Sequence, residues 1–287
     1  MKVAFKTLGC KLNYSETSSI SREFIKKGFQ KVSFNESSDV YIINTCSVTK
    51  NADKEFKYLI NKVKKKNPKS YVVAIGCYAQ LKPKKISKIF GVDLVVGADK
   101  KFDVLNYINL DNKENNNVHS CEINSVDFFK NSFSMGERTR SFLKVQDGCD
   151  YKCTYCTIPL ARGKSRSGQI LKLVENAKYL VSNGIKEIVL TGVNIGDFGI
   201  FDINSGVKES NFLELIKHFN KIRNLARLRI SSIEPNLLSN EIIDFVFNSK
   251  KFVNHFHIPL QSGSDKILKL MKRRYLTNLY EYKINKI

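Results

Sequence analysis

The first 110 residues alternate short apolar runs with longer stretches in which apolar and polar residues follow a helical period. This alternation is typical of strands joined by helices in an open parallel sheet. The sequence predicts four strands, at residues 3–10, 40–47, 71–78 and 93–98. It also predicts intervening helices, at residues 13–28, 49–66 and 82–90. Gly28 is expected to cap the first helix at its carboxyl end.

A second alternation of the same kind begins near residue 140. Its strand-like runs are residues 141–149, 187–194, 225–235 and 256–264. Its helix-like runs are residues 169–184, 211–222, 240–252 and 264–275. Such units have right-handed crossovers and predict a parallel barrel, open or closed, with its functional face at the carboxyl ends of the strands.

The pattern divides the chain into three parts. Residues 1–110 form an amino-terminal domain and residues 140–287 a second domain. After one last helix near residue 101, the polar residues 111–139 read as a linker. Cys121 lies in this linker and is expected to be an incidental thiol without a partner.

Three cysteines of the first domain fall at or just after the carboxyl ends of predicted strands: Cys10, Cys46 and Cys77. In an open parallel sheet these ends share one edge, where such folds bind their ligands. A free cysteine can also pack as a small buried hydrophobe. Three in equivalent positions favour a metal cluster over that alternative.

The stretch "DGCDYKCTYCTIPLARG" places three more cysteines, Cys149, Cys153 and Cys156, within eight residues. A closed structural zinc site needs four Cys or His ligands. No histidine occurs between His119 and His218, so no fourth ligand of this kind is close in sequence. A metal centre here would keep one coordination position open for chemistry.

Composition narrows the setting. The chain has seven cysteines, an odd number, and no apolar run long enough for a signal peptide or a membrane span. We therefore expect a cytoplasmic protein that uses its thiols for metal binding or catalysis. The net charge of +21 favours a polyanionic partner such as nucleic acid. A general Lys/Asn bias, visible in "NKVKKKNPK" and "DNKENNN", is the alternative explanation of that charge.

The spacing CxxxCxxC, with Tyr155 before its last cysteine, resembles the signature of radical S-adenosylmethionine enzymes. The resemblance implies that Cys149, Cys153 and Cys156 hold a 4Fe-4S cluster whose open iron binds the amino and carboxylate groups of S-adenosylmethionine. One electron, from a donor such as flavodoxin or ferredoxin, would then release a 5′-deoxyadenosyl radical. Tyr155 would lie beside the adenine; the alternative is a plain core aromatic.

Upstream, "TLGCKLNYSET", "NTCSVTKNADKE" and "AIGCYAQ" extend the likeness, and the chain resembles the methylthiotransferase family. This implies a second, auxiliary 4Fe-4S cluster on Cys10, Cys46 and Cys77. "SSIEP" and "PLQSGSDKILKLMKRRY" resemble the branch that transfers a methylthio group to C2 of N6-threonylcarbamoyladenosine 37, in the tRNA anticodon loop. The alternatives are the isopentenyladenosine branch, the branch acting on a ribosomal protein aspartate, and an inactive truncated iron–sulfur fragment.

Other residues enter through the same resemblance, which assigns the chemistry to the clusters and to no catalytic side chain. Arg162 and Arg166 could bind the cofactor carboxylate or an RNA phosphate, or could be solvated charges after a loop. The residues expected to contact the cofactor are Tyr155, Thr191, Gly192, Asn194, Ser232, Glu234, Gln261 and Ser262.

Members of this family continue past the equivalent of "MKRRY" into further barrel strands and a small β-rich RNA-binding domain. The resemblance therefore implies an amino-terminal open parallel α/β domain followed by an incomplete radical-SAM (β/α) partial barrel, with the RNA-binding domain absent. The run at residues 256–264 would then have an unpaired edge and uncovered apolar surface. We expect a truncated or split-gene product that is weakly active unless the missing part is supplied in trans.

Overall fold

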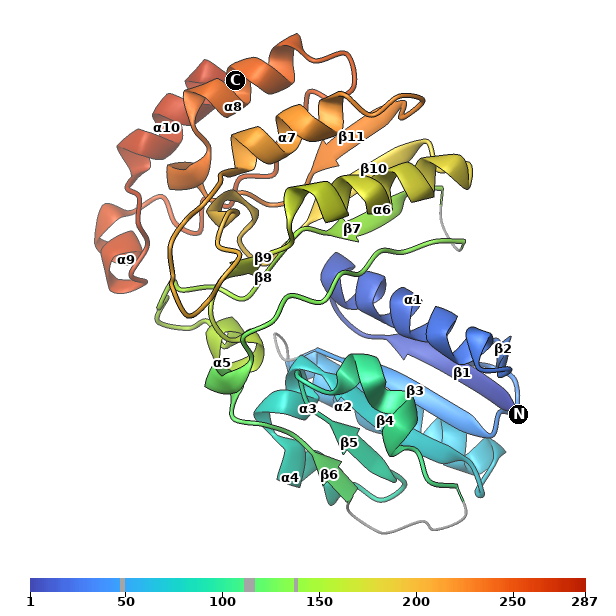
Figure 1. Ribbon diagram of the computed structural model, residues 1–287. Coiled ribbons are helices and arrows are strands. Elements are labelled where there is room, and N and C mark those ends of the chain that lie inside the picture. The colour runs from blue at the N-terminus through green and yellow to red at the C-terminus, as the bar shows by residue number, and fades with distance from the viewer. Residues whose placement is uncertain (47–49, 111–116, 137–138) are drawn as a thin grey trace. The chain divides into compact units, whose positions relative to one another are not determined.

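Two compact units make up the chain in the computed structural model, and each has its own sheet and core (Figure 1). The structure describes residues 1–46, 50–110, 117–136 and 139–287, apart from the side chains of residues 50–53. The first unit comprises Met1–Val126 and Leu160–Arg162, and the second comprises Asp127–Pro159 and Gly163–Ile287. The expected α/β class is confirmed.

The first unit is built on a six-stranded sheet of order β2-β1-β3-β4-β5-β6, in which all neighbours are parallel. Its strands are β1 Lys2–Thr7, β2 Gln30–Val32, β3 Val40–Thr45, β4 Tyr71–Gly76, β5 Leu94–Val96 and β6 Asn117–His119. The central strands β3 and β4 are buried at every position, as expected for a parallel sheet covered on both faces. The four predicted strands are confirmed, except that Ser47 lies outside the described residues.

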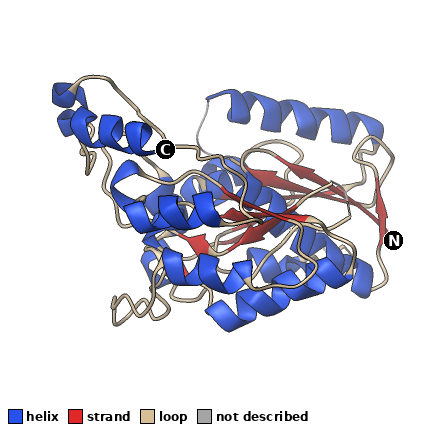
Figure 2. Cartoon of the chain, turned by 90° about the horizontal axis from the view of Figure 1, so that it is seen from above, coloured by secondary structure: helices blue, strands red, loops and turns tan. Residues whose placement is uncertain are grey.

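Helices cover both faces of this sheet, and Figure 2 shows strands between helices. Their bounds are α1 Lys11–Lys26, α2 Lys50–Lys66, α3 Cys77–Leu81, α4 Pro83–Ser87, η1 Lys101–Tyr107 and η2 Ile123–Ser125. Ile42 packs with Phe24 of α1 in one core layer, and its neighbour Ile43 packs with Phe56 of α2 in the other. Each such side chain, when fully buried, stabilises the fold by about 1.5–3 kcal/mol.

Helix α1 ends as the sequence predicts. Gly28 has a φ of +86°, and its N–H donates to the carbonyl of Ile25 at 3.0 Å. The N–H of Phe29 donates to the carbonyl of Phe24 at 3.1 Å, which completes a Schellman motif. Glycine therefore stops the helix and turns the chain toward β2.

The second unit is built on a three-stranded parallel sheet of order β11-β10-β7. The strands are β7 Ser141–Lys144, β10 Glu187–Thr191 and β11 Arg227–Ile230, and β8 Gln146–Asp147 pairs antiparallel with β9 Arg166–Ser167. The helices are α6 Ile170–Ser182, α7 Phe212–Asn220, α8 Asn240–Asn248, α9 Asp265–Leu270 and α10 Thr277–Lys286, with short turns η3 Ile195–Asp197 and η4 Pro235–Leu237. Helix α5, Ile158–Arg162, begins in this unit, and its last three residues belong to the first. The three strands and the helices α6 to α9 confirm predicted runs.

Local sequence explains where helices α7 and α8 begin. The Asn211 side chain accepts the N–H of Glu214 at 2.9 Å, and the Ser239 hydroxyl accepts the N–H of Ile242 at 3.4 Å. Asparagine and serine are preferred at this position because each satisfies a backbone donor that the first turn leaves free. Both helices then bury an apolar face against the sheet.

The fourth predicted strand of this unit, residues 256–264, is wrong. The segment forms only an isolated bridge between His257 and Ser232, and a second bridge joins Phe252 to Leu228. Pro259 has no N–H for a ladder hydrogen bond, and Gln261 takes a left-handed φ of +65° that ends any extended run. The predicted incomplete barrel therefore has a sheet of three strands in the described chain.

Three further features escaped prediction. The edge strands β2 and β6 have three residues each, too few for a visible alternation, and α10 has little apolar period. Strand β6 lies inside the predicted linker, of which residues 111–116 and 137–138 are outside the described ranges. By contacts the two units divide between Val126 and Asp127. None of the described helices is long and apolar enough to cross a membrane.

Gly76, at the junction of β4 and α3, tests this packing. Its φ is +96°, and a Cβ there would lie 2.2 Å from Asn44 Oδ1 and 2.5 Å from the Thr45 carbonyl oxygen. We expect Gly76→Ala to lower the free energy of unfolding by about 2–4 kcal/mol, because backbone strain and overpacking act together. The matched control is Gly28→Ala, at a similar φ of +86° but in open space, with an expected loss of about 1 kcal/mol. Urea unfolding followed by circular dichroism measures both; equal losses would contradict the packing argument.

Candidate functional site

The first set of cysteines lies at the ends of three neighbouring strands. Cys10 follows β1, Cys46 follows β3 and Cys77 follows β4, and these strands are adjacent in the sheet (Figure 1). A Cβ on Gly9 would lie 2.9 Å from Cys46 Sγ, so this thiol lies against the turn that carries Cys10. Cys10 also lies close enough to Cys77 for its charge to act on that thiol. The predicted convergence at one sheet edge is confirmed.

A fully buried asparagine joins two of these turns. Asn13 Nδ2 donates to the carbonyls of Leu8 and Thr45, each at 3.1 Å, and these residues lie just before Cys10 and Cys46. Asn13 Oδ1 accepts from Arg162 Nη2 at 2.6 Å and faces Cys10 Sγ at 3.9 Å. Every donor and acceptor of this amide is therefore in use.

The third turn is held through Thr45. Its hydroxyl donates to the carbonyl of Ile75 at 2.6 Å and accepts the N–H of Ala79 at 3.1 Å. These two contacts fix the start of α3, whose first residue is Cys77. Sequence reasoning missed Asn13 and Thr45. The available signal was an asparagine, a poor helix former, three residues after a predicted ligand.

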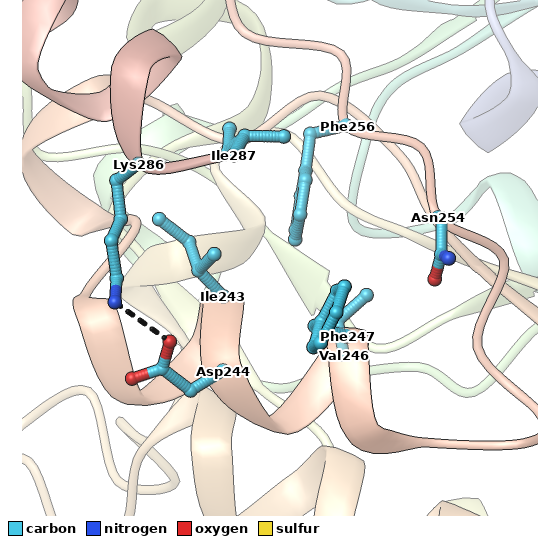
Figure 3. A pocket seen from close by; sticks show the side chains of 8 residues that line it. All are labelled: Ile243, Asp244, Val246, Phe247, Asn254, Phe256, Lys286 and Ile287. Carbon is cyan, nitrogen blue, oxygen red and sulfur yellow. Dashed lines mark ion pairs between the residues drawn. The ribbon is translucent and has the colours of Figure 1, made fainter.

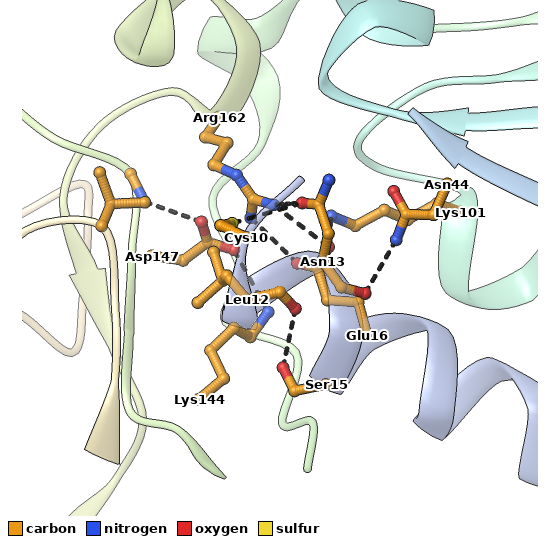
Figure 4. Close-up of polar contacts among 12 residues, drawn as sticks. Cys10, Leu12, Asn13, Ser15, Glu16, Asn44, Lys101, Lys144, Asp147 and Arg162 are labelled. Carbon is orange, nitrogen blue, oxygen red and sulfur yellow. Dashed lines mark hydrogen bonds and ion pairs between the residues drawn. The ribbon is translucent and has the colours of Figure 1, made fainter. Parts of the chain in front are cut away.

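Charged groups are buried near Cys10 (Figure 4). The carboxylate of Glu16 is fully buried; Oε2 lies 2.7 Å from Lys101 Nζ, and Oε1 lies 3.0 Å from Arg162 Nη1. Buried charges are tolerated when they are paired in this way. Burial raises the pKa of the Cys77 thiol, and the cations of Arg162 and Lys101 act in the opposite direction. Two cations therefore contact one carboxylate in this cluster.

The second set lies on the loop between β8 and α5. The N–H of Cys156 donates to the carbonyl of Cys153 at 3.0 Å, which makes a tight turn, and the N–H of Cys149 donates to the carbonyl of Gly163 at 3.1 Å. Asn194 Nδ2 lies 4.0 Å from Cys149 Sγ. The loop therefore brings Cys149 to the turn after β10, at the strand end where the barrel prediction puts the functional face.

Gln146 holds this loop in the way that Asn13 holds the first set. Its buried Nε2 donates to the carbonyl of Gly148 at 2.8 Å, next to Cys149. Its Oε1 accepts the N–H groups of Val193 and Asn194, each at 2.9 Å. One side chain thus joins the cysteine loop to the turn after β10. Sequence reasoning missed this residue, and no local pattern marked it.

Two thiols of the second set, Cys149 and Cys153, have raised pKa values, which favours their neutral form. Burial raises the pKa of Cys149 to about 12, and the neighbouring Cys156 thiol also raises it. The hydrogen bond from the N–H of Tyr151 acts in the opposite direction. Burial also raises the pKa of Cys153, against the charge of Arg273. A metal must displace these protons to bind. Among the described residues no three His, Cys, Asp or Glu side chains already stand together as a metal-ion site, so coordination by either set stays a prediction.

Three of the residues predicted to contact a cofactor meet through Arg273, which sequence reasoning missed. Arg273 Nη1 pairs with Glu234 Oε1 at 3.1 Å, and its Nη2 donates to the hydroxyl of Tyr155. The Tyr155 hydroxyl in turn donates to Gln261 Oε1 at 2.8 Å. Tyr155 is 54% exposed, so the alternative of a plain core aromatic is wrong.

The other predicted residues are more dispersed. Thr191 and Asn194 are buried at the end of β10, and Gly192 lies against Gln146. Ser232 is bonded to His257, while the Ser262 hydroxyl accepts the N–H of Ser264 at 3.1 Å. The structure therefore does not bring Ser262 together with the rest through any described contact.

Several buried polar atoms of this unit have no hydrogen-bond partner among the described residues. Burying such an atom without a partner costs about 1–3 kcal/mol. A small ligand with amino, carboxylate and hydroxyl groups would satisfy them, and thiolates are the donors that iron–sulfur clusters use. The atoms, at and beyond the carboxyl ends of β10 and β11, are Thr191 Oγ1, Asn194 Oδ1, Ser231 Oγ, Asn236 Oδ1 and Arg273 Nε.

The two predicted arginines are both buried. Arg162 is 3% exposed and bonded to Asn13 and Glu16. Arg166 is 5% exposed; its Nε donates to the carbonyl of Phe128 at 2.8 Å, and its Nη2 lies 3.5 Å from Asp147 Oδ2. The alternative of solvated charges is wrong. Anion binding by either stays a prediction, and it would require exchange of these bonds.

Cys121 also differs from expectation, since it has a partner. Burial and a hydrogen bond with Asp99 raise the pKa of its thiol, and Gln80 Nε2 donates to its carbonyl at 2.9 Å. This seventh cysteine is therefore fixed in the first unit.

The uncovered apolar surface predicted near residues 256–264 stays a prediction, since of that segment Phe256 alone lines the apolar pocket beside α8. A pocket of about 360 Å³ lies beside α8 (Figure 3), and Phe247 in its wall is 72% exposed. None of the predicted site residues lines it. Its walls are Ile243, Asp244, Val246, Phe247, Asn254, Phe256, Lys286 and Ile287.

Two family models match the chain. Residues 2–97 match a family described as uncharacterized protein family UPF0004, and residues 143–286 match the radical SAM superfamily. The chain is 39% identical over 289 residues to the threonylcarbamoyladenosine tRNA methylthiotransferase MtaB of Bacillus subtilis (strain 168), which covers 99% of this chain and 63% of the relative. It is 40% identical to the protein of the same name from Aquifex aeolicus (strain VF5), over 99% of this chain and 69% of the relative.

A tRNA-2-methylthio-N(6)-dimethylallyladenosine synthase of Thermodesulfovibrio yellowstonii is 32% identical over 98% of this chain and 64% of its own length. The chain spans less than two thirds of the length of the Bacillus subtilis relative. Among solved structures, the radical S-adenosylmethionine methyltransferase TsrM from Kitasatospora setae superposes with a TM-score of 0.67 at 12% identity, over 99% of this chain and 65% of that one. At such identity the likeness shows the fold alone.

The pKa of Cys149 predicts how the metal-free chain reacts with iodoacetamide. At pH 8 a thiol of pKa about 12 has about a thousandfold less thiolate than one at 9.0, and its higher nucleophilicity compensates only in part. We expect Cys149 to be alkylated at least roughly thirtyfold more slowly than the exposed Cys10, with a rate that keeps rising as the pH passes 9. Peptide mass spectrometry of a labelling time course measures this. Equal rates at pH 8 would contradict the burial of Cys149.

Proposed function

We propose, from the premise that this chain belongs to the radical S-adenosylmethionine methylthiotransferase family, that it transfers a methylthio group to C2 of N6-threonylcarbamoyladenosine 37 in tRNA. The family is shown by the superfamily match and by the relative that is 40% identical, of which the chain covers 69%. The activity, the substrate and the partners are our proposal.

The observation that carries the proposal is the presence of two separate sets of three thiols. The first set, Cys10, Cys46 and Cys77, follows three adjacent strands of one sheet, and the second set lies on a loop of the other unit. A radical enzyme that only cleaves its cofactor needs the second set. The additional first set suits a reaction that also has to deliver sulfur. Each set would hold one 4Fe-4S cluster.

The second unit fits S-adenosylmethionine by its donor set. Thr191 and Asn194, with buried oxygens that lack a partner, could accept from the amino group of the methionine part. Tyr155 is exposed and fixed by Arg273 and Gln261, which leaves a ring face for the adenine. Gly192, Ser232, Glu234 and Ser262 remain proposed contacts. When bound, the cluster would supply the electron that splits this cofactor into methionine and a 5′-deoxyadenosyl radical.

The side chains of this unit would keep the reacting groups in a fixed geometry. Gln146 fixes Cys149 relative to Asn194, so thiol and amide keep one geometry when the cofactor arrives. The Arg273–Glu234 pair limits how far Tyr155 can turn. A side chain fixed by its neighbours loses little entropy on binding.

The partner would be the anticodon loop of tRNA. Bases in such loops are single-stranded and can be turned out into a pocket. The net charge of +21 supports attraction to the phosphate backbone. An electron donor such as flavodoxin or ferredoxin would complete the reaction, which we place in the cytosol.

The relatives favour the threonylcarbamoyl branch over the dimethylallyl branch. Four relatives named for the first are 37–40% identical to the chain, and the first three named for the second are 32–33% identical. The dimethylallyl substrate is therefore the second candidate.

Iron content tests the two-cluster part of the proposal. We expect Cys149→Ala/Cys153→Ala/Cys156→Ala to lower the iron of the anaerobically reconstituted chain by about half and to abolish cofactor cleavage, because one of two cysteine sets is removed. Cys10→Ala/Cys46→Ala/Cys77→Ala should also halve the iron yet keep formation of 5′-deoxyadenosine. The matched control is Cys121→Ala, with unchanged iron. Full iron in either triple variant would show that its cysteines are not ligands.

Modified-nucleoside mass spectrometry tests the substrate. In tRNA from a strain without this gene we expect loss of the 2-methylthio derivative of threonylcarbamoyladenosine, with the dimethylallyl derivative unchanged. Restoring the wild-type gene should return the product, and the Cys149→Ala form should not. Loss of the dimethylallyl derivative alone would assign the second candidate.

A further inference from the structure

Arg162 follows the second set of cysteines in sequence but contacts residues beside the first. Its helix, α5, begins two residues after Cys156. Its guanidinium nevertheless belongs to the first unit, where it is buried against α1. An arginine placed so deeply has a cost of desolvation that its contacts must offset.

These contacts use the planar fork of the guanidinium. Nη1 donates to Glu16 Oε1 at 3.0 Å, and Nη2 donates to Asn13 Oδ1 at 2.6 Å and lies 3.3 Å from Glu16 Oε2 (Figure 4). Lysine cannot make this arrangement, because its three donors radiate from a single nitrogen. The shape of the Arg162 side chain therefore fits Asn13 and Glu16 on α1.

Asn13 connects Arg162 to the thiols. Its Oδ1 faces both the guanidinium and Cys10 Sγ, while its Nδ2 holds the carbonyls that precede Cys10 and Cys46. With Arg162 on its oxygen, the amide cannot flip without breaking all of these contacts. The guanidinium thus orients the amide that joins two cysteine turns.

The same cluster also sets a local charge. Glu16 is shared by Arg162 and Lys101, so two cations contact this one carboxylate. Charges act strongly at short range in a protein interior. The reduction potential of an iron–sulfur cluster depends on nearby charge and on hydrogen bonds around its sulfurs.

We infer that Arg162 is a positioning residue for Cys10 and Cys46, and that together with Glu16 and Lys101 it sets the potential of a cluster held by the first set. This inference rests on the proposed function, in which those thiols bind a 4Fe-4S cluster. Arg162 would thus act on the first set of cysteines, although it follows the second set in sequence.

The test uses the full chain with Cys149→Ala/Cys153→Ala/Cys156→Ala, so that only the first set can bind iron. In this background the variants are Arg162→Met, Arg162→Lys and Glu16→Gln. The matched control is Arg223→Met, which removes one exposed guanidinium. Iron per chain, the midpoint potential from an EPR-monitored redox titration, and the rate of iron loss to a chelator are measured for each.

We expect Arg162→Met to lower the midpoint potential, because the reduced cluster carries one more negative charge and loses a nearby cation. Glu16→Gln should raise it, since an anion is removed. Arg162→Lys keeps the charge but not the fork, so its potential should stay near that of the background while iron is lost faster. Arg223→Met should match the background in all three measurements.

If Arg162→Met does not give folded protein by circular dichroism, Arg162→Met/Glu16→Gln replaces it and is compared with Glu16→Gln, and a lower potential in the double variant supports the inference. An unchanged potential and unchanged iron loss in the Arg162 variants overturn the inference alone. A background chain that binds no iron overturns the two-cluster proposal, and this inference with it.

Discussion

A parallel strand can turn only where it leaves the sheet, and in both units this constraint decides where the reactive side chains are. Strands β3 and β4 are buried at every position, and the polar residues of β3, Asn44 and Thr45, lie at its carboxyl end. The cysteines lie beyond the strand ends, and the amides and charges that contact them come from neighbouring elements. Because adjacent strands end at one edge, residues more than thirty positions apart in sequence become neighbours there.

Two buried amides make these turns rigid. Asn13 and Gln146 each join a cysteine turn to the next strand's turn through their donors and acceptors, and each hydrogen bond contributes about 0.5–1.5 kcal/mol net. Their larger effect is on geometry, since a buried amide that lost one partner would retain the cost of an unsatisfied group. The cysteine loops are thereby held by side chains of the chain itself.

Much of this arrangement could be predicted from the sequence, and the missing parts share a cause. Runs such as "VYIINT" and "YVVAIG" have a local signal, because a buried parallel strand is mostly apolar. From those strands the convergence of Cys10, Cys46 and Cys77 followed by topology. Arg162 could not be placed in the same way, since its partners in α1 lie 146 and 149 positions away and nothing local marks them. The segment around His257, by contrast, has the apolar run of a strand but also contains Pro259, and it forms only an isolated bridge.

Helix α5 has a consequence for how these proteins can be reassorted by recombination. The first unit takes Leu160–Arg162 from the middle of the second, so it is not a contiguous gene segment. A fusion that exchanged only the residues before Asp127 would graft one parent's Glu16 onto another parent's α5. Without a matching arginine, Glu16 would keep Lys101 but lose its bidentate partner, and breaking such a buried pair costs about 3–5 kcal/mol. A fusion therefore keeps this pair intact only when residues 1–126 and 160–162 come from the same parent.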